Sequence, residues 1–465
     1  MTDTKSDKKQ KKELDKIKSS VFSRSLSLAK LTLQAGTKLA GQSLSSALSN
    51  DSIENTKLKI LSSQAQLISK ELGELKGSLM KAGQMLSMYG EHFLPPEANQ
   101  FLKTLQSDSP PLKWEAIYPI IVSELGQDKV DELEIEKESI ASASLGQVHR
   151  AKIKATNEMI VLKVQYPDVD KAIESDLVAL RRILAVLKLI PKDLNLDPLF
   201  SEIKTMLIQE TNYVLEADMT EEFYDKLKND QRFIIPKVYR RYSNRKILST
   251  SFERGLRVDD PLIQSLPQQR RNQIASHFLD LYFKEIFVWH TVQTDPHNGN
   301  YKIRMNPHGQ DQLILFDFGA TRKYEKSFII PYLKMVKAAY FNDSEALTRH
   351  ALELNFIQNS DQPELKKVFT DFCLETVEPF LLPDDPRNKG QINSAGEYDW
   401  KNTDLPQRLS KKVFLVINQF TWRTPPEEIL FLDRKTGGVF VFLSTLKAKM
   451  NSRDLLKPYI ERDIS

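Results

Sequence analysis

Two acidic residues and an amide lie close together in one short segment from Gln293 to Gly319, QTDPHNGNYKIRMNPHGQDQLILFDFG. Within it, YKIRM and DQLILF flank the polar turn NPHGQ and predict a β-hairpin, which would bring Asn300 and Asp317 together at its two ends. An amide oxygen and a carboxylate are hard oxygen ligands that suit Mg²⁺ accompanied by phosphate oxygens. Asp295, on the same loop as Asn300, is then a candidate base or orienting group. The pattern predicts phosphoryl transfer.

Phosphoryl transfer also requires a lysine on the phosphates, and the predicted strand MIVLKVQYP supplies Lys163 among apolar neighbours. A charged residue in an apolar strand needs a carboxylate partner when it is buried. The helical stretch that follows offers two, Glu210 and Glu216. The alternative interpretation, unrelated surface acids, does not explain why the lysine strand, the loop acid and the hairpin occur in this order.

The segment before the lysine strand, IASASLGQVHRA, stands where a protein kinase has a glycine-rich loop, but it contains a single glycine. Small residues let a backbone approach phosphates, although an Ala- and Ser-rich turn tolerates positive φ angles less well than glycine does. We therefore expect nucleotide to sit differently here than in a typical protein kinase. The candidate nucleotide-binding residues are Ala141, Ser142, Ala143, Ser144, Gly146, Gln147 and Lys163.

The elements that must position these residues predict an α+β protein. Alternation of β-branched residues begins at Glu132 and predicts a small sheet, and helical periodicity dominates beyond Pro261 apart from the hairpin. Residues 381–405 are too polar for a core and predict a surface loop. The other expected elements are strands at 234–242 and 245–253 and helices over 54–106, 169–189 and 199–230.

Length and composition limit the class of protein. A chain of 465 residues exceeds the size of most single domains and predicts two lobes with a ligand-binding cleft. The 66 basic and 62 acidic residues nearly balance, which argues against nucleic acid as a partner. No apolar stretch is long enough to span a bilayer. The single cysteine, Cys373, excludes an intrachain disulfide and reads as a buried apolar side chain or, alternatively, as a reactive thiol.

The first residues of the chain are a separate case. Residues 1–18 hold seven lysines and four acids, and this composition predicts a solvated leader that is neither a signal peptide nor a transit peptide. The sequence after this leader predicts an amphipathic helix. We expect this helix to pack on the protein's own core or, alternatively, to lie on a membrane surface. The expected segments are a leader (1–20), the amphipathic helix (21–50), a helical extension (51–130), a β-rich lobe (131–260) and a helical lobe (261–465).

Six motifs together resemble the UbiB/AarF family of atypical kinase-like proteins, which includes the Coq-type proteins of ubiquinone biosynthesis. The first, KxGQ, reads Lys81, Gly83 and Gln84; the others are ASASLGQVH, VLKVQYP, QTDPHNGN, FDFG and LDRKTGGVFVFLSTLKAKM. The resemblance runs from about residue 72 to the C-terminus. It implies a bilobal protein-kinase-like fold in which the helical KxGQ extension lies over the cleft and occludes the place of a peptide substrate.

The resemblance also implies roles for individual residues. Lys163 would be the phosphate lysine, Glu216 its helix partner and Asp295 the catalytic-loop acid. Asn300 and Asp317 would hold Mg²⁺ beside ATP or ADP. From the extension, Lys81 and Gln84 would reach into the site, and Glu210 would belong to the family's ExD motif. Here that motif reads Glu-Thr-Asn, so that an uncharged Asn212 stands in place of the acid.

The family further implies partners and a location. A lipid or quinone precursor, a membrane surface and quinone-biosynthesis proteins would be the partners. The oligomeric state stays open, with a homodimer as one option. The two C-terminal membrane spans of the bacterial UbiB subgroup are absent from this sequence, so membrane contact would come from residues 1–50 or an exposed helix. We therefore expect a cytoplasmic protein that is either free in the cytosol or peripheral on the inner membrane.

Some of these residues have simpler interpretations. Lys81 could be solvated, and Gln84 could cap or bridge helices. His297 and His149 are better explained as structural residues than as metal ligands. The methionines around Lys81, which are Met80, Met85 and Met88, are typical of a core, or of a lipid-facing groove.

Three functions compete at this point. The first is a Mg²⁺/ATP-dependent atypical kinase or ATPase that supports isoprenoid quinone biosynthesis or lipid handling. The second is a pseudokinase scaffold that binds nucleotide without phosphoryl transfer, which the substitution at Asn212 favours slightly. The third is a small-molecule phosphotransferase of the aminoglycoside or choline kinase type, against which the KxGQ extension counts.

Overall fold

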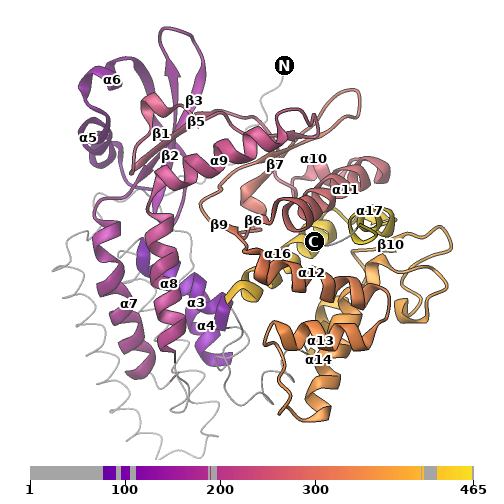
Figure 1. The fold of residues 1–465 in the computed structure, drawn as a ribbon. Coiled ribbons are helices and arrows are strands. Elements are labelled where there is room, and N and C mark those ends of the chain that lie inside the picture. Colours follow the sequence, from indigo (N-terminus) through magenta and orange to yellow (C-terminus); the bar gives the residue numbers. More distant parts are fainter. Residues whose placement is uncertain are drawn as a thin grey trace, which may run out of the picture. The chain divides into compact units, whose positions relative to one another are not determined.

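The computed structural model of this chain describes residues 77–90, 96–104, 111–186, 189, 196–409, 411–412 and 427–462. These residues form two compact units. Figure 1 labels their helices and strands. Unit 1 contains the described residues up to Asp218 together with Lys237–Phe252, and unit 2 contains Met219–Pro236 and the described residues from Glu253 onward. The predicted leader and amphipathic helix, residues 1–50, lie outside the described residues.

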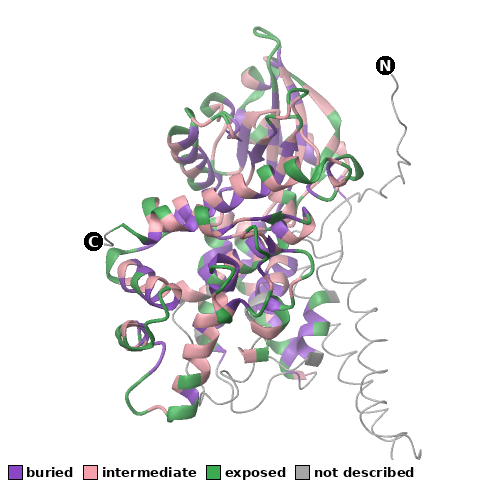
Figure 2. Cartoon of the chain, turned by 90° about the vertical axis from the view of Figure 1, so that its right-hand side faces the viewer, coloured by how far each residue is buried: buried purple, intermediate pink, exposed green. Residues whose placement is uncertain are grey.

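Unit 1 is built on an antiparallel sheet in the order β1-β2-β3-β5. Its strands are β1 (Leu133–Ser142), β2 (Gly146–Ile153), β3 (Met159–Gln165) and β5 (Ile247–Ser251). Along β3, Ile160, Leu162 and Val164 are fully buried while Lys163 on the opposite face is only partly buried. Figure 2 colours the described part of the chain by burial. This is the alternation expected of a strand with one face in the core. The sequence prediction of a lysine-bearing strand is therefore confirmed.

The helices of unit 1 form two groups. The helices α5 (Trp114–Leu125) and α6 (Gln127–Asp131) share a core with the buried side chains of the sheet. The second group contains α3, which contacts α4, α7 and α8. Its members are α3 (Ser78–Gly90), α4 (Pro96–Thr104), α7 (Val169–Val186) and α8 (Asp197–Glu210). A further helix, α9 (Tyr213–Leu227), begins in unit 1 and ends in unit 2.

Unit 2 contains the predicted hairpin. Its strands β7 (Tyr301–Arg304) and β8 (Gln312–Leu315) pair antiparallel with Tyr301 opposite Leu315, and β4 (Phe233–Ile234) joins β8 in parallel. The hairpin prediction is therefore confirmed. A second pair, β6 (Thr291–Gln293) and β9 (Thr321–Lys323), is antiparallel.

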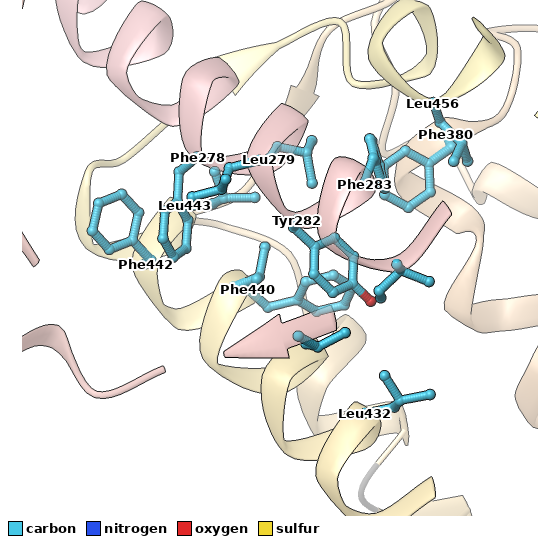
Figure 3. Packing of buried hydrophobic residues seen from close by; sticks show 14 of the residues in the cluster. Phe278, Leu279, Tyr282, Phe283, Phe380, Leu432, Phe440, Phe442, Leu443 and Leu456 are labelled. Carbon is cyan, nitrogen blue, oxygen red and sulfur yellow. The ribbon is translucent and has the colours of Figure 1, made fainter. Parts of the chain in front are cut away.

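The helices of unit 2 surround a large apolar core. They are α10 (Pro261–Gln264), α11 (Gln268–Lys284), α12 (Lys326–Tyr340), α13 (Ser344–Glu353), α14 (Pro363–Thr376), α16 (Glu427–Thr445) and α17 (Arg453–Ile460). Aromatic side chains of α11 pack against α16 (Figure 3), and the rings of Phe278 and Phe442 lie 4.0 Å apart between centroids. Such contacts add to the free energy gained from burial. In this way α16 is fixed on α11.

Two predictions about individual elements were wrong. Residues 381–405 are not simply a surface loop, because Tyr398 and Trp400 are buried, and β10 (Tyr398–Asp399) pairs with β11 (Lys449–Met450). The indole of Trp400 donates to the Ser452 hydroxyl at 3.1 Å. A few aromatic residues in a polar segment can anchor it to a core, although its average composition is polar.

The strand predicted over 234–242 is also shorter than expected. Only Phe233–Ile234 form β4, and a 3-10 turn occupies Arg240–Tyr242. Pro236 explains the end of the strand, because proline has no N–H to donate to a sheet. Among the described residues, no helix is both long enough and apolar enough to cross a membrane.

Candidate functional site

Unit 1 places the predicted phosphate lysine in contact with one of its two predicted partners. The Lys163 ammonium donates to both carboxylate oxygens of Glu216, at 2.7 and 2.8 Å. It also lies 5.0 Å from the centre of the Tyr213 ring. The side chains of Lys163 and Glu216 are 19% and 6% exposed, so each charge needs its partner. The alternative partner, Glu210, makes a different contact.

Glu210 pairs with the KxGQ lysine. The Lys81 ammonium on α3 lies 3.0 Å from the Glu210 carboxylate at the end of α8, and the two side chains are 11% and 14% exposed. The simpler interpretation of Lys81 as a solvated residue is therefore wrong. On the same helix Met80 and Met85 are buried, as expected of core residues, whereas the side chain of Met88 is outside the described set. The role of Gln84, which is partly buried, stays a prediction.

The junction between α8 and α9 lies in the sequence between Glu210 and Glu216, the carboxylates of the two ion pairs. Here Asn212 caps α9, because its Oδ1 accepts from the Val214 amide at 3.2 Å. The side-chain amide of Gln165 on β3 donates to the Thr211 carbonyl at 2.9 Å and ties the junction to the sheet. Asn and Asp are equally good N-caps. Asn212, in place of the ExD acid, therefore lacks the negative charge but still caps the N-terminus of α9.

The predicted nucleotide loop is the connection between β1 and β2. The Ala143 amide donates to the Gly146 carbonyl at 2.8 Å, and the register of β1 shifts on each side of Ser139. A β-carbon on Gly146 would lie 2.4 Å from the Val164 carbonyl oxygen. The single glycine of the loop is thus required for the close approach of β3, and its φ angle is not positive.

Gln147 differs most from its predicted role as a nucleotide-binding residue. Its buried amide accepts from the Leu112 N–H at 2.8 Å and donates to the Leu112 carbonyl at 3.1 Å. It also lies 2.9 Å from Nε2 of His149, whose Nδ1 contacts the Glu136 carbonyl at 2.9 Å. Burial lowers the pKa of His149, consistent with a neutral ring protonated on Nδ1. Both side chains therefore brace the fold, as predicted for His149, and the side chain of Gln147 is occupied by these contacts.

Unit 2 holds the loop that carries Asp295, and an amide that the sequence analysis did not assign organises this loop. The Gln293 side chain donates to the carbonyls of Asp295 and Asp317, at 2.8 and 3.2 Å. Its own oxygen accepts from the Tyr301 hydroxyl at 2.8 Å. The Asn300 amide also donates to the Asp295 carbonyl, at 3.0 Å. One buried glutamine therefore links the backbones of Asp295, the predicted catalytic acid, and Asp317, a predicted metal ligand.

The Asp317 backbone has a conformation that is uncommon for a residue other than glycine. Its φ angle is +57°, and its Oδ1 accepts from the Gly319 amide at 3.2 Å. Aspartate tolerates this region better than most residues because its short side chain can bond locally. The next residue, Phe318, is buried with its ring 4.6 Å from that of Phe223. Strained residues of this kind cluster at functional sites.

The oxygen donors of unit 2 fit a magnesium ion. Among the described residues there is no group of three or more His, Cys, Asp or Glu side chains that could hold a metal by itself. Mg²⁺ is usually bound by one or two protein oxygens together with substrate phosphates and water. Because the Asn300 NH₂ group bonds to the Asp295 carbonyl, the Asn300 oxygen is the atom left for a cation. Asn300 and Asp317 therefore stay the predicted ligands of an ion that would arrive with a nucleotide.

Two further predictions are confirmed. His297 braces the loop, since its Nδ1 accepts from the Gly299 amide at 3.0 Å. Cys373 is buried, and burial raises the pKa of its thiol to about 12, so it is a core residue rather than a reactive thiol.

A cation that the sequence analysis did not assign contacts Asp295. The Arg434 guanidinium, from α16, forms an ion pair with the Asp295 carboxylate, and each side chain is 13% exposed. The two residues are 139 positions apart in the sequence. The only signal was the C-terminal motif LDRKTGG, which carries no chemistry when read alone.

Comparisons with known proteins find relatives over most of the chain. The mitochondrial atypical kinase coq-8 of Caenorhabditis elegans is 30% identical over 389 residues, which are 83% of this chain and 49% of that protein. The chain thus spans about half the length of this relative. The mitochondrial atypical kinase COQ8 of Saccharomyces cerevisiae is 27% identical over 456 residues, 97% of this chain and 87% of that one.

A solved structure and a family model complete the comparison. The structure of the Rv3197–erythromycin complex from Mycobacterium tuberculosis matches 87% of this chain and 98% of that one, with a TM-score of 0.57 and 23% identity. At this identity the match supports the mixed α+β fold alone. The model of the ABC1 atypical kinase-like domain matches residues 104–351, about half of the sequence. The chain therefore belongs to the ABC1 atypical kinase-like family, the UbiB family of the sequence resemblance.

Proposed function

We propose that this protein is an atypical kinase or ATPase that uses Mg²⁺ with ATP or ADP. The observation that carries the proposal is that the Lys163 ammonium donates to both carboxylate oxygens of Glu216. A strand lysine held by a helix glutamate is the arrangement that an active protein kinase uses to direct the lysine toward the phosphates. The family membership supports the same conclusion.

Residues of each unit would have separate tasks in this reaction. In unit 1, Lys163 would bind phosphate oxygens while Glu216 fixes its direction. In unit 2, Asn300 and Asp317 would hold the ion, which neutralises charge on the phosphates when it is bound. Asp295 would orient the attacking group and accept its proton. Gln293 would keep Asp295 and Asp317 at a fixed spacing through their carbonyls.

The acceptor and the location are proposals that rest on the family resemblance and on the relatives' names. We propose that the protein acts on, or helps to extract, an isoprenoid quinone precursor or another lipid at a membrane surface. Two relatives are named as mitochondrial atypical kinases. The Lys-rich residues 1–18 would favour an anionic membrane, with each lysine near the surface contributing roughly 1 kcal/mol. Quinone-biosynthesis proteins and a second copy of the chain are the proposed protein partners.

The proposal is tested by measuring ATP hydrolysis with and without anionic liposomes and phenolic mimics of a quinone head group. We expect the wild type to hydrolyse ATP and to be stimulated by one of these additions. Lys163→Ala should abolish the activity. Lys171→Ala is the matched control, because it removes a lysine from an exposed pair with Asp168 in the same unit. Failure of the wild-type protein to hydrolyse ATP under all of these conditions would refute the proposal.

A second candidate is a scaffold that binds nucleotide without transferring phosphate. The uncharged Asn212 favours it, because an ExD acid is missing. The variant Asp317→Asn separates the two candidates in a strain that lacks the gene. If quinone levels fall and a precursor accumulates although the variant protein is present, catalysis is needed. If the variant restores quinone to the wild-type level after losing ATP hydrolysis, the scaffold is the function.

A further inference from the structure

A segment of α16, Arg434-Lys435-Thr436-Gly437-Gly438, packs against the loop that carries Asp295; we name it the RKTGG segment. Its first residue, Arg434, forms the ion pair with the Asp295 carboxylate. Its last residue, Gly438, lies against the neighbouring Pro296, since a β-carbon on Gly438 would be only 2.1 Å from the proline ring. The segment therefore contacts two consecutive loop residues, one through charge and one through shape.

The RKTGG segment is itself held firmly. The Lys435 ammonium lies 2.7 Å from the Glu285 carboxylate, and these side chains are only 1% and 2% exposed. The Thr436 hydroxyl lies 2.6 Å from the hydroxyl of Tyr282 on α11. Glu285 begins the π-helical turn Glu285–Trp289, which follows α11 and leads to β6 and the Asp295 loop. A buried ion pair is costly to disrupt and tolerates little variation in geometry, so it fixes α16 relative to the start of this loop.

The two glycines of the segment show that the fit is specific. A β-carbon on Gly437 would meet nothing within 4 Å, whereas one on Gly438 would collide with Pro296. Both glycines lie within α16, where glycine is a poor helix former. Gly438 is therefore explained by the close approach of the loop, and Gly437 is not.

We infer that the RKTGG segment sets the position of Asp295, and that Arg434 is a positioning residue for the phosphoryl transfer proposed above. A guanidinium group is planar and rigid, so it restricts a carboxylate to few orientations. A lysine at this place would supply the charge without the fixed geometry. The inference rests on the proposed function, but it concerns a contact within unit 2 that can also be measured without turnover.

The kinetic experiment compares kcat and KM for ATP in the wild type, Arg434→Met and Arg434→Lys. We expect Arg434→Met to lower kcat on the order of 10²-fold with little change in KM, because a misplaced catalytic group costs about that much. Arg434→Lys should recover only part of the loss. The control is Arg453→Met, which removes a partly buried arginine that bonds to the Tyr340 hydroxyl on another helix. If Arg434→Met behaves like this control, the inference is overturned.

A double-mutant cycle shows whether Arg434 acts through Asp295. Residues that act as a unit have non-additive effects. The double variant with Asp295→Asn and Arg434→Met should therefore turn over ATP no more slowly than Asp295→Asn alone. If the two losses multiply, Arg434 has a separate role and the inference fails. If Asp295→Asn leaves no measurable turnover, the same cycle is run on the exchange rate of the loop.

Hydrogen exchange of peptides covering residues 291–300 provides that second readout. We expect faster exchange in Arg434→Met and Gly438→Ala, and unchanged exchange in Arg453→Met and Gly437→Ala. If the wild type shows no ATP turnover, the proposed function fails while this measurement still decides the inference. If Gly438→Ala does not fold, the arginine variants decide it. Wild-type exchange in Arg434→Met would overturn the inference in either case.

Discussion

The ion pair between Lys163 and Glu216 gives the most informative test of unit 1. Glu216→Ala would leave the Lys163 ammonium without its carboxylate on a strand whose other face is core. Breaking a fully buried pair costs about 3–5 kcal/mol, and because the lysine is 19% exposed we expect about 2 kcal/mol here. The rate of ATP hydrolysis should fall further than this loss of stability alone would explain. The reason is that Lys163 would lose the group that directs it toward the phosphates.

Replacing both partners by apolar residues should separate these two effects. Lys163→Met with Glu216→Leu removes both charges at similar volume, a change that is often neutral or stabilising. We therefore expect near wild-type stability without ATP hydrolysis. The assay is native-state hydrogen exchange of β3 peptides in urea, which reports the free energy of opening this strand. Wild-type stability of Glu216→Ala, or a double variant as unstable as Glu216→Ala, would refute the reasoning.

Three further predictions concern stability. Gly146→Ala should destabilise unit 1 by about 1–3 kcal/mol, measured by urea unfolding, because the new methyl group would meet the Val164 carbonyl. Gln147→Ala should cost about 1–3 kcal/mol in the same assay, because it leaves the buried Leu112 amide and carbonyl without partners; no loss would contradict the bracing role. Burial lowers the pKa of His277 from 6.5 to about 4, so the unfolded state binds the proton first and stability should fall as the pH drops from 6.5 to 4. His277→Leu should make the pH dependence of unfolding less steep, and an unchanged slope would contradict this.

Sequence alone predicted the parts of the structure that depend on local pattern. The β3 alternation and the hairpin of β7 and β8 follow from side-chain periodicity and a polar turn, so they could be read directly. The contact between Lys163 and Glu216 required a further step, because the sequence offered Glu210 equally well. The resemblance to the family favoured Glu216. The structure explains this preference, because Glu210 forms an ion pair with Lys81 instead. The placement of the KxGQ extension and the segment boundaries stay predictions.

The residues that sequence analysis missed depend on contacts between distant positions. Gln293 is an ordinary polar residue until its amide is seen to bond to the carbonyls of two acids. Arg434 lies far along the chain from Asp295, so no spacing rule connects them. Trp400 was missed for another reason. The average composition of residues 381–405 is polar, and this average concealed a large buried side chain. Side-chain periodicity predicts helices and strands, whereas a single contact between distant residues leaves no periodic pattern in the sequence.

The most direct test of the central claim is ATP hydrolysis by the purified protein in the presence of Mg²⁺ or of a chelator, with Asp317→Asn as the comparison. The wild type should hydrolyse ATP only with Mg²⁺, and Asp317→Asn should lose activity on the order of 10²-fold or more, because one of the two predicted ion-binding side chains would no longer be a carboxylate. Equal hydrolysis by the two proteins, or hydrolysis by the wild type that persists in the chelator, would contradict the assignment of Asp317 and with it the phosphoryl-transfer account.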